Sequence, residues 1–391
     1  MPMKGYLKPG YSLAGRIDRT LSTHPEPLFP LHTDEYWMEQ ALIESMNATG
    51  LSQPNPSVGC VLVKGTQEIA RGFTQAYRQA HAERDAFSRI PSGTTLEEVT
   101  AYVTLEPCSH FGFQPPCVDL LLKSPIPRIV IAALDPDPRV NGEGIQKLRA
   151  AGKTVELQVL DEEARALNHP FFKTRSTQKT VWIGKWAQMP SGHLADLHGN
   201  SKWITGEKSR AYTHWLRQKY DCIVVGASTF LKDQPKLTVR DCAYPHHRNP
   251  TRFVFDPQGK LLHLPVESLD GFKVLVSKSV LAQHSGVSSE IFVPIPVTPD
   301  SPDLAAAFRE TLDSLAFERP LQSVMIEGGP RLLNLLLGAG KLDALHIFTG
   351  QQKFLELSER ERIAWIPDES WSCAASHKFD DDLLQEWVKK D

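Results

Sequence analysis

Apolar and polar positions in the first half of the chain follow two different periods, which predict helices and strands. Apolar residues recur at helical spacing at Trp37, Ala41, Leu42 and Met46, after Thr33, whose hydroxyl can cap a helix. Residues 57–64 form a β-branched apolar run with so few polar positions that we expect a strand inside a sheet. The same patterns predict strands at 69–73, 100–105, 128–134 and 154–160, and helices at 81–90 and 144–151. Because strands and helices alternate, the first half is expected to be a layered α/β domain.

A second series of strands and helices begins at Val181, after the polar stretch 173–180, which we take as a domain boundary. Strands are predicted at 181–188, 222–225, 252–255, 272–276 and 323–327, and helices at 207–220 and 304–317, with a further helix starting at Pro330. A loop of small residues is expected at 226–229. The sequence therefore predicts an N-terminal extension over 1–30, a first domain over 31–175 and a second over 176–391, whose tail from about residue 351 carries no recognisable motif.

Composition narrows the class of protein. A chain of 391 residues exceeds the usual size of one core, which agrees with two domains. Its 43 basic and 46 acidic side chains nearly balance, and the lack of a dense basic run speaks against nucleic acid as a partner. No apolar run approaches the roughly 18 residues of a membrane span, and residues 1–30 lack the apolar core of a secretory signal.

The cysteines indicate the redox compartment. Four of the six have no spacing typical of a disulfide framework, namely Cys60, Cys222, Cys242 and Cys373. Reduced thiols and a cytoplasmic location are therefore expected. The sequence does not rank oligomeric states, so a homo-oligomer stays open.

Four residues of the first domain form the pattern of a catalytic zinc site. A zinc ion that acts on a substrate takes three protein ligands and leaves the fourth position to water, and His81, Cys108 and Cys117 supply such a set. Glu83 is placed to take a proton from that water and to pass it to a leaving amine. His-x-Glu followed by Pro-Cys is the pattern of the zinc-dependent nucleobase deaminases, although eight residues separate the two cysteines here instead of two. Taken alone, His-Ala-Glu is more often a helix start, and two cysteines eight residues apart are more often buried thiols. The order of the two motifs along the chain favours a zinc site.

Asn55 stands between two prolines, directly before the predicted strand at 57–64. The prolines restrict the backbone on both sides, so that the amide is expected at the mouth of the sheet. By itself Asn55 is more often a turn residue. Beside a zinc site, a hydrogen bond from its amide to a substrate is the better interpretation.

Longer stretches around these residues resemble the bifunctional riboflavin-biosynthesis deaminase/reductase family. In the first half the resemblance lies in residues 54–60, 81–83, 104–110, 115–117 and 135–142, and in the second half in 202–206, 226–229, 233–240 and 327–329. It covers about residues 33 to 350. The family also places eight residues between its zinc cysteines, which accounts for the unusual spacing.

The resemblance implies a cytidine-deaminase-like three-layer domain followed by a dihydrofolate-reductase-like domain, acting in turn on one pyrimidine nucleotide. With Zn²⁺ and Glu83, the first would replace the exocyclic amine of a diaminohydroxypyrimidine by oxygen. With NADPH, the second would reduce the ribose to a ribityl chain. The motifs imply substrate contacts at Ser201, Arg217, Leu237, Arg240 and Glu327. They imply NADPH contacts at Ala187, Trp203, Thr229, Asp233, Gly328 and Gly329.

Several positions depart from the family pattern. Phe113 and Gln114 stand where the family usually has Arg and Thr, Ser191 replaces an Asp, and Pro257 replaces a Ser. Two alternatives therefore stay open. The zinc site could deaminate another nucleotide or base, and the second domain could bind a ligand or join copies of the chain without hydride transfer.

Overall fold

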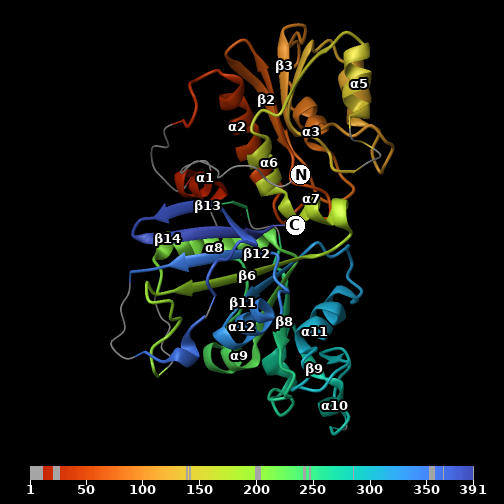
Figure 1. Ribbon diagram of the computed structural model, residues 1–391. Coiled ribbons are helices and arrows are strands. Elements are labelled where there is room, and N and C mark those ends of the chain that lie inside the picture. Colours follow the sequence, from red (N-terminus) through yellow and green to blue (C-terminus); the bar gives the residue numbers. More distant parts are fainter. Residues whose placement is uncertain are drawn as a thin grey trace. The chain divides into compact units, whose positions relative to one another are not determined.

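The computed structural model describes residues 12–20, 27–137, 140, 142–198, 204–240, 244–245, 248–284, 286–351, 357–363 and 365–390 (Figure 1). Contacts divide the chain into two compact units, one made by the described residues up to Lys179 and the other by nearly all of those from Thr180 onward. Helix α7 (His169–Thr177) runs through most of the polar stretch that was predicted as a boundary. We refer to the two units as the N-terminal and the C-terminal unit.

The N-terminal unit is built on a five-stranded sheet in the order β2-β1-β3-β4-β5. Its strands are β1 (Gly59–Lys64), β2 (Gln67–Phe73), β3 (Val99–Leu105), β4 (Arg128–Ala133) and β5 (Thr154–Leu157). β1 runs antiparallel to both of its neighbours, whereas β3, β4 and β5 are parallel. The prediction of an internal strand at 57–64 is confirmed, because β1 pairs on both sides.

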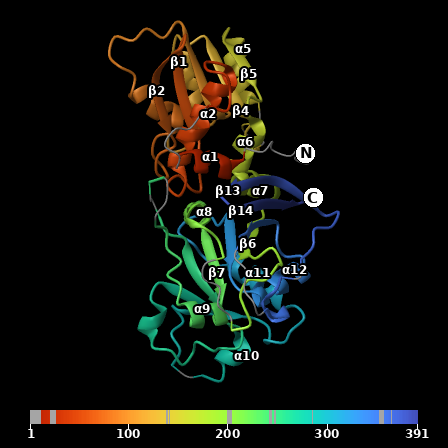
Figure 2. The same cartoon turned by 90° about the vertical axis from the view of Figure 1, so that its left-hand side faces the viewer.

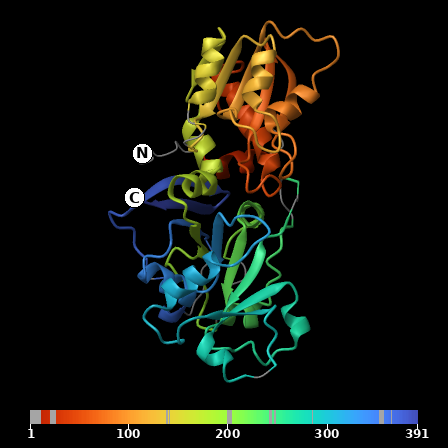
Figure 3. The ribbon, with the colours of Figure 1, turned by 90° about the vertical axis from the view of Figure 1, so that its right-hand side faces the viewer.

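Helices cover both faces of this sheet. A Cβ atom on Gly59 would collide with the backbone of Ala41 in α2 (Asp34–Ser45), and one on Gly72 would collide with that of Ala86 in α3 (Ala82–Ser88). Since α2 and α3 lie on opposite sides of the strands (Figure 1), the predicted three-layer arrangement is confirmed. The remaining elements are α1 (Leu13–Thr20), η1 (Met46–Ala48), α4 (Cys117–Lys123), α5 (Glu143–Ala150) and α6 (Asp161–Leu167). Figure 3 views the unit from the side of α5.

The C-terminal unit contains a nine-stranded sheet in the order β10-β9-β8-β7-β11-β6-β12-β14-β13. The strands from β10 to β12 are parallel, whereas β14 pairs antiparallel with β12 and with β13. Their bounds are β6 (Val181–Gln188), β7 (Cys222–Gly226), β8 (Thr251–Phe255), β9 (Phe272–Ser277), β10 (Phe292–Ile295), β11 (Ser323–Glu327), β12 (Ala344–Thr349), β13 (Trp371–Phe379) and β14 (Asp382–Lys389).

This second sheet is also covered on both faces, as Figure 2 shows for α8 and α12. On one face Trp182 packs edge-on against Phe308 of α11, with 5.1 Å between the ring centroids. On the other face Tyr212 of α8 lies 6.2 Å from Phe348. The helices are α8 (Glu207–Lys219), α9 (Ala227–Asp233), α10 (Lys278–Leu281), α11 (Leu304–Asp313) and α12 (Pro330–Gly338), with η2 (Val266–Leu269) and η3 (Glu359–Glu361).

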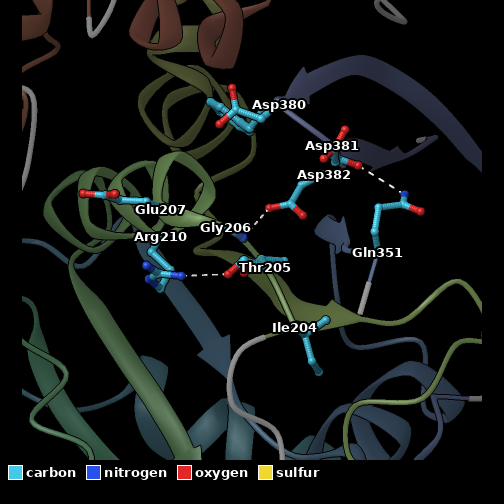
Figure 4. A pocket seen from close by; sticks show the side chains of 10 residues that line it. Ile204, Thr205, Gly206, Glu207, Arg210, Gln351, Asp380, Asp381 and Asp382 are labelled. Atoms are coloured by element: carbon cyan, nitrogen blue, oxygen red, sulfur yellow. Dashed lines mark hydrogen bonds between the residues drawn. The ribbon is translucent and has the colours of Figure 1, made fainter. Parts of the chain in front are cut away.

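The hairpin of β13 and β14 contributes to the start of α8 (Figure 4). The N-cap of α8 is Gly206, which has no side chain to accept a hydrogen bond. The carboxylate of Asp382 accepts instead, from the Gly206 N–H at 2.7 Å and from the Ser209 hydroxyl at 2.6 Å. A cavity of about 500 Å³ opens beside this cap, between the first turn of α8 and the residues 379–382.

One local prediction was wrong, because the loop of small residues expected at 226–229 is the first turn of α9. Cys108 lies in a loop ahead of α4, which begins at Cys117. The tail from residue 351, for which no elements were predicted, contains the strands β13 and β14. Among the described residues, no helix is long and apolar enough to cross a membrane.

Candidate functional site

The topology of the N-terminal sheet brings the predicted zinc residues to one edge. β2 and β3 both run antiparallel to β1, so their carboxyl ends, at Phe73 and Leu105, lie at the same edge. His81 follows β2 as the N-cap of α3, and Cys108 follows β3. Asn55 precedes β1, whose first residue pairs with Phe73, and therefore lies at this edge as well.

The three predicted ligands have the spacing that a tetrahedral zinc ion requires. The Nδ1 atom of His81 lies 3.5 Å from the Cys108 sulfur and 3.6 Å from the Cys117 sulfur. Zinc–nitrogen and zinc–sulfur bonds of about 2.05 and 2.3 Å at a tetrahedral angle separate such atoms by about 3.6 Å. Among the described residues this is the group of histidine, cysteine and acidic side chains that could bind a metal ion.

The surroundings favour ionisation of the Cys108 sulfur, whereas contact with Cys108, together with burial, raises the pKa of Cys117. The Cys117 N–H group points at the Cys108 sulfur, 3.3 Å away. Contact with the Cys117 side chain lowers the pKa of Cys108 most, and contact with His81 lowers it further. Cys117 is fully buried at the start of α4, and a thiolate so close to a second one requires a cation. The donor set thus fits zinc.

Glu83 lies in the first turn of α3, two residues after His81, and is only 4% exposed. Burial raises the pKa of Glu83, and the neighbouring Cys108 adds to the shift. A carboxyl whose protonated form is stabilised in this way can both accept and return a proton near neutral pH.

Glu106 is a supporting residue at this edge to which the sequence motifs gave no role. Its carboxylate accepts hydrogen bonds from the backbone of Gly142, at 2.9 and 3.1 Å, and of Asp135, at 3.3 Å. Burial raises the pKa of Glu106 to about 7. The contacts connect the loop after β4 to the strand that leads to Cys108. The available signal was an acid at the end of an apolar strand, two residues before a proposed ligand.

In the C-terminal unit the structure brings together two predicted substrate contacts, Arg217 and Glu327. The guanidinium of Arg217 donates two hydrogen bonds to the Glu327 carboxylate, at 2.8 and 3.0 Å. Lys185 was not predicted, yet its Nζ lies 3.4 Å from the same carboxylate. Burial opposes ionisation of Glu327, but the charges of Arg217 and Lys185 outweigh it and lower the pKa of Glu327. The signal for Lys185 was a charged residue in the otherwise apolar strand 181–188.

Two further predicted substrate contacts of this unit, Leu237 and Arg240, lie on a segment that hydrogen-bonds to α8. His214 connects Arg217 to this segment, because its Nδ1 atom is 3.5 Å from Arg217 Nη1 and accepts the backbone N–H of Arg240 at 3.3 Å. The Arg240 side chain is exposed, whereas Leu237 is buried and has a left-handed backbone, with φ of 51°. Ser201 lies outside the described residues.

Three of the predicted NADPH contacts, Thr229, Gly328 and Gly329, lie at the carboxyl ends of the parallel strands β7 and β11. The hydroxyl of Thr229 accepts the N–H of Gly329 at 3.2 Å, and a Cβ atom on Gly329 would crowd that hydroxyl at 3.0 Å. Gly329 is also the N-cap of α12, where free N–H groups favour a phosphate. A turn without side chains at a helix N-terminus fits a dinucleotide. Ala187 lies near the end of β6, Asp233 is exposed at the end of α9, and Trp203 is outside the described residues.

Family comparisons match both units. Residues 31–133 match the cytidine and deoxycytidylate deaminase zinc-binding region, and residues 187–350 match the RibD C-terminal domain. The riboflavin biosynthesis protein RibD of Aquifex aeolicus is 37% identical over 317 residues, which cover 81% of this chain and 86% of that protein. The protein of the same name from Escherichia coli is 31% identical over 325 residues, or 81% of this chain and 87% of that protein.

Solved structures agree over nearly the whole chain. A diaminohydroxyphosphoribosylaminopyrimidine deaminase/5-amino-6-(5-phosphoribosylamino)uracil reductase from Thermotoga maritima superposes with a TM-score of 0.72 at 31% identity, covering 92% of this chain and 99% of that one. RibD from Acinetobacter baumannii gives a TM-score of 0.67 at 28% identity, covering 93% of this chain and all of that one. This chain therefore belongs to the RibD family of riboflavin biosynthesis, in which a zinc-dependent deaminase and an NADPH-dependent reductase share one polypeptide.

Proposed function

We propose that the N-terminal unit removes the exocyclic amine of a diaminohydroxypyrimidine phosphoribosyl nucleotide and that the C-terminal unit then reduces its ribose to a ribityl chain. The observation that carries the proposal is the match between the His81, Cys108 and Cys117 spacing and a tetrahedral ion, with Glu83 in the adjoining helical turn. The names of the Thermotoga protein's two activities support this choice of substrates.

In the deamination, His81, Cys108 and Cys117 are the proposed zinc ligands. Bound zinc lowers the pKa of a water molecule and so provides a nucleophile near neutral pH. With zinc bound, Glu83 would accept a proton of that water as the water oxygen bonds to the amine-bearing ring carbon. It would then pass the proton to the amine, which would leave as ammonia when the carbon–nitrogen bond breaks. The burial of Glu83 excludes bulk water, so that the proton passes between Glu83 and the substrate. Asn55, at the same edge, is the proposed hydrogen-bond partner of the pyrimidine.

In the reduction, the turn Gly328–Gly329, Thr229, Asp233, Ala187 and Trp203 are the proposed NADPH contacts. The cofactor supplies the hydride for the ribose. Arg217 and Arg240 carry the positive charge suited to the substrate phosphate, and Ser201, Leu237 and Glu327 complete the proposed contacts. Because Glu327 orients the Arg217 guanidinium through two hydrogen bonds, it acts partly by positioning that residue.

The proposal is tested by supplying the phosphoribosyl nucleotide to the zinc-loaded chain and measuring ammonia release and NADPH oxidation separately. We expect ammonia without NADPH, followed by oxidation of NADPH when it is added. Metal analysis should find about one zinc per chain, and Cys108→Ser should lose both the zinc and the ammonia release. A folded chain without zinc would contradict the proposed ligands.

The reductase reaction is tested separately by supplying the nucleotide that has already been deaminated. Oxidation of NADPH on that compound by the Cys108→Ser variant would support an independent reductase. Failure of the wild-type chain to oxidise NADPH on it would favour a second unit that binds ligand without hydride transfer.

The cytoplasm is the proposed location. Among the described residues, Cys60, Cys108, Cys117 and Cys373 carry free thiols, as expected for a reducing compartment. Fractionation of cells that express the full chain tests this location.

A further inference from the structure

An exposed aromatic cluster lies on the loop between the two cysteines of the proposed zinc site. Phe111 is 76% exposed and Phe113 is 64% exposed, although both are large apolar side chains. The rings of Phe113 and Tyr77 meet edge to face, 5.8 Å apart. The guanidinium carbon of Arg78 lies 4.6 Å from the Phe113 centroid and 5.3 Å from that of Tyr77. We call Tyr77, Arg78 and Phe113 the rim cluster.

Arg78 has an unusual backbone conformation. Its φ of 74° is in the left-handed region, which disfavours a residue with a long side chain. The loop on the other side is fastened as well, because Arg84 donates a hydrogen bond to the carbonyl of Pro115 at 2.9 Å. Strain of this kind persists where the surroundings select it, often at a functional site.

The positive charge of Arg78 has no partner among the described residues. Neighbouring arginines are paired, Arg71 with Glu68 and Arg89 with Asp85, but no carboxylate lies within ion-pair distance of Arg78. Stacking occupies the faces of a guanidinium and leaves the N–H groups at its edge directed outward. Such a fork matches the oxygens of a phosphate.

The rim cluster is close to the proposed zinc ligands. Arg78 precedes His81 by three residues and Phe113 precedes Cys117 by four. At no more than about 3.6 Å per residue, their Cα atoms lie within about 11 and 14 Å of the respective ligands. This is the scale of a nucleotide whose ring is at the metal.

We propose that Arg78, stacked on Phe113 and Tyr77, binds the phosphate of the nucleotide that is deaminated at the zinc site. The inference rests on the proposed function of the N-terminal unit. It assigns a specificity role to Arg78, namely selection of the phosphorylated substrate over the nucleoside.

The experiment compares the phosphoribosyl nucleotide with the same compound after a phosphatase has removed its phosphate. For Arg78→Ala we expect the KM of ammonia release from the nucleotide to rise by about 10- to 100-fold, the usual effect of losing a charge-assisted contact. The KM for the nucleoside should not change. Arg78→Lys should recover part of the loss, and Phe113→Leu should show a smaller rise. Lys123→Ala, which removes an exposed positive charge at the other end of α4, serves as the control.

Binding of ribose 5-phosphate, measured by calorimetry, separates the phosphate contact from turnover. It should be weaker in Arg78→Ala than in the wild-type chain. Equal binding by the two chains, or an equal effect of the substitution on nucleotide and nucleoside, would overturn the role of Arg78. Absence of ammonia release from the wild-type chain, with ribose 5-phosphate binding still dependent on Arg78, would overturn the proposed function alone.

Discussion

Two buried glutamates illustrate how the surroundings of a residue determine its chemistry. Burial raises the pKa of Glu83, whereas Arg217 and Lys185 overcome burial and lower the pKa of Glu327. Glu83 is therefore suited to exchange a proton during catalysis, and Glu327 to remain an anion that orients a guanidinium.

Replacing Glu83 by Gln should separate metal binding from proton transfer. The amide keeps the size of the side chain but cannot take up the proton, so we expect ammonia release to fall by at least about 100-fold. Zinc content, measured by metal analysis, should stay at the wild-type level because Glu83 is not a ligand. Full activity of this variant would rule out Glu83 as the acid and base.

The grouping of the proposed zinc ligands was predictable because local spacing and residue type define them. His81 and Glu83 are two positions apart, and the cysteines lie beside prolines in a short segment. The partner of Lys185 was not predictable in this way. Glu327 is 142 residues away and meets Lys185 only because β6 and β11 are paired.

At the scale of elements, α8 is stabilised by a residue from outside its own segment. Asp382 provides the hydrogen-bond acceptor that Gly206 lacks, and α8 carries both Arg217 and His214. Because β14 supplies this cap, the start of α8 depends on the hairpin of β13 and β14.

Substituting Asp382 by Ala should destabilise the C-terminal unit by about 1–2 kcal/mol, the range found for lost helix caps. Seven of the eight tryptophans lie from Trp182 onward, so tryptophan fluorescence during urea unfolding reports mainly on this unit. Asp381→Ala is the matched control, because the exposed neighbour contributes its backbone carbonyl, and not its side chain, to the contact with Gln351. Equal stability of the two variants would contradict the capping role.

The stability of the same unit should depend on pH through His214. Burial, followed by the charges of Arg217 and Arg240, lowers the pKa of His214 to about 4 from an ordinary value of 6.5. The unfolded chain then binds more protons than the folded chain between these values. Stability is therefore fully present above pH 6.5 and is lost as the pH falls toward 4.

Urea unfolding at a series of pH values checks this expectation. The decrease in stability between pH 6.5 and 5 should be smaller in His214→Gln, while His263→Gln, at an exposed position, should behave like the wild-type chain. If the stability of all three chains changed equally with pH, His214 would be excluded as the source of the pH dependence.

The elements that the sequence did not predict are those whose partners are distant. β13 has the sequence WSCAASHKF, in which small residues prevail and burial does not alternate. It forms a strand because β14 lies beside it, and β14 in turn pairs with β12. The parallel strands were predictable because they are buried on both faces and read as continuous apolar runs.

At the scale of the whole molecule, the proposed sites of the two cofactors belong to separate units. The proposed zinc ligands belong to the N-terminal unit, and the proposed NADPH contacts belong to the C-terminal unit. The layered α/β fold of both units was predictable from alternating strands and helices, and the two family models match one unit each.

Removing zinc with a chelator should therefore abolish ammonia release without weakening NADPH binding. A fluorescence titration of the chelated and the zinc-loaded chain with NADPH measures the second quantity. Re-addition of zinc should restore ammonia release. A loss of NADPH affinity on chelation would show that the two sites are coupled.

The position of β14 between β12 and β13 also affects how the protein is made. On the ribosome, the whole N-terminal sheet and the strands β6 to β12 are translated before β14, which covers the free edge of β12. Until then, the nascent chain exposes an unpaired apolar strand that can join another chain. A premature stop after β12 should yield a protein whose N-terminal sheet is intact. This protein should aggregate strongly, because the sheet of its C-terminal unit ends at the unpaired strand β12.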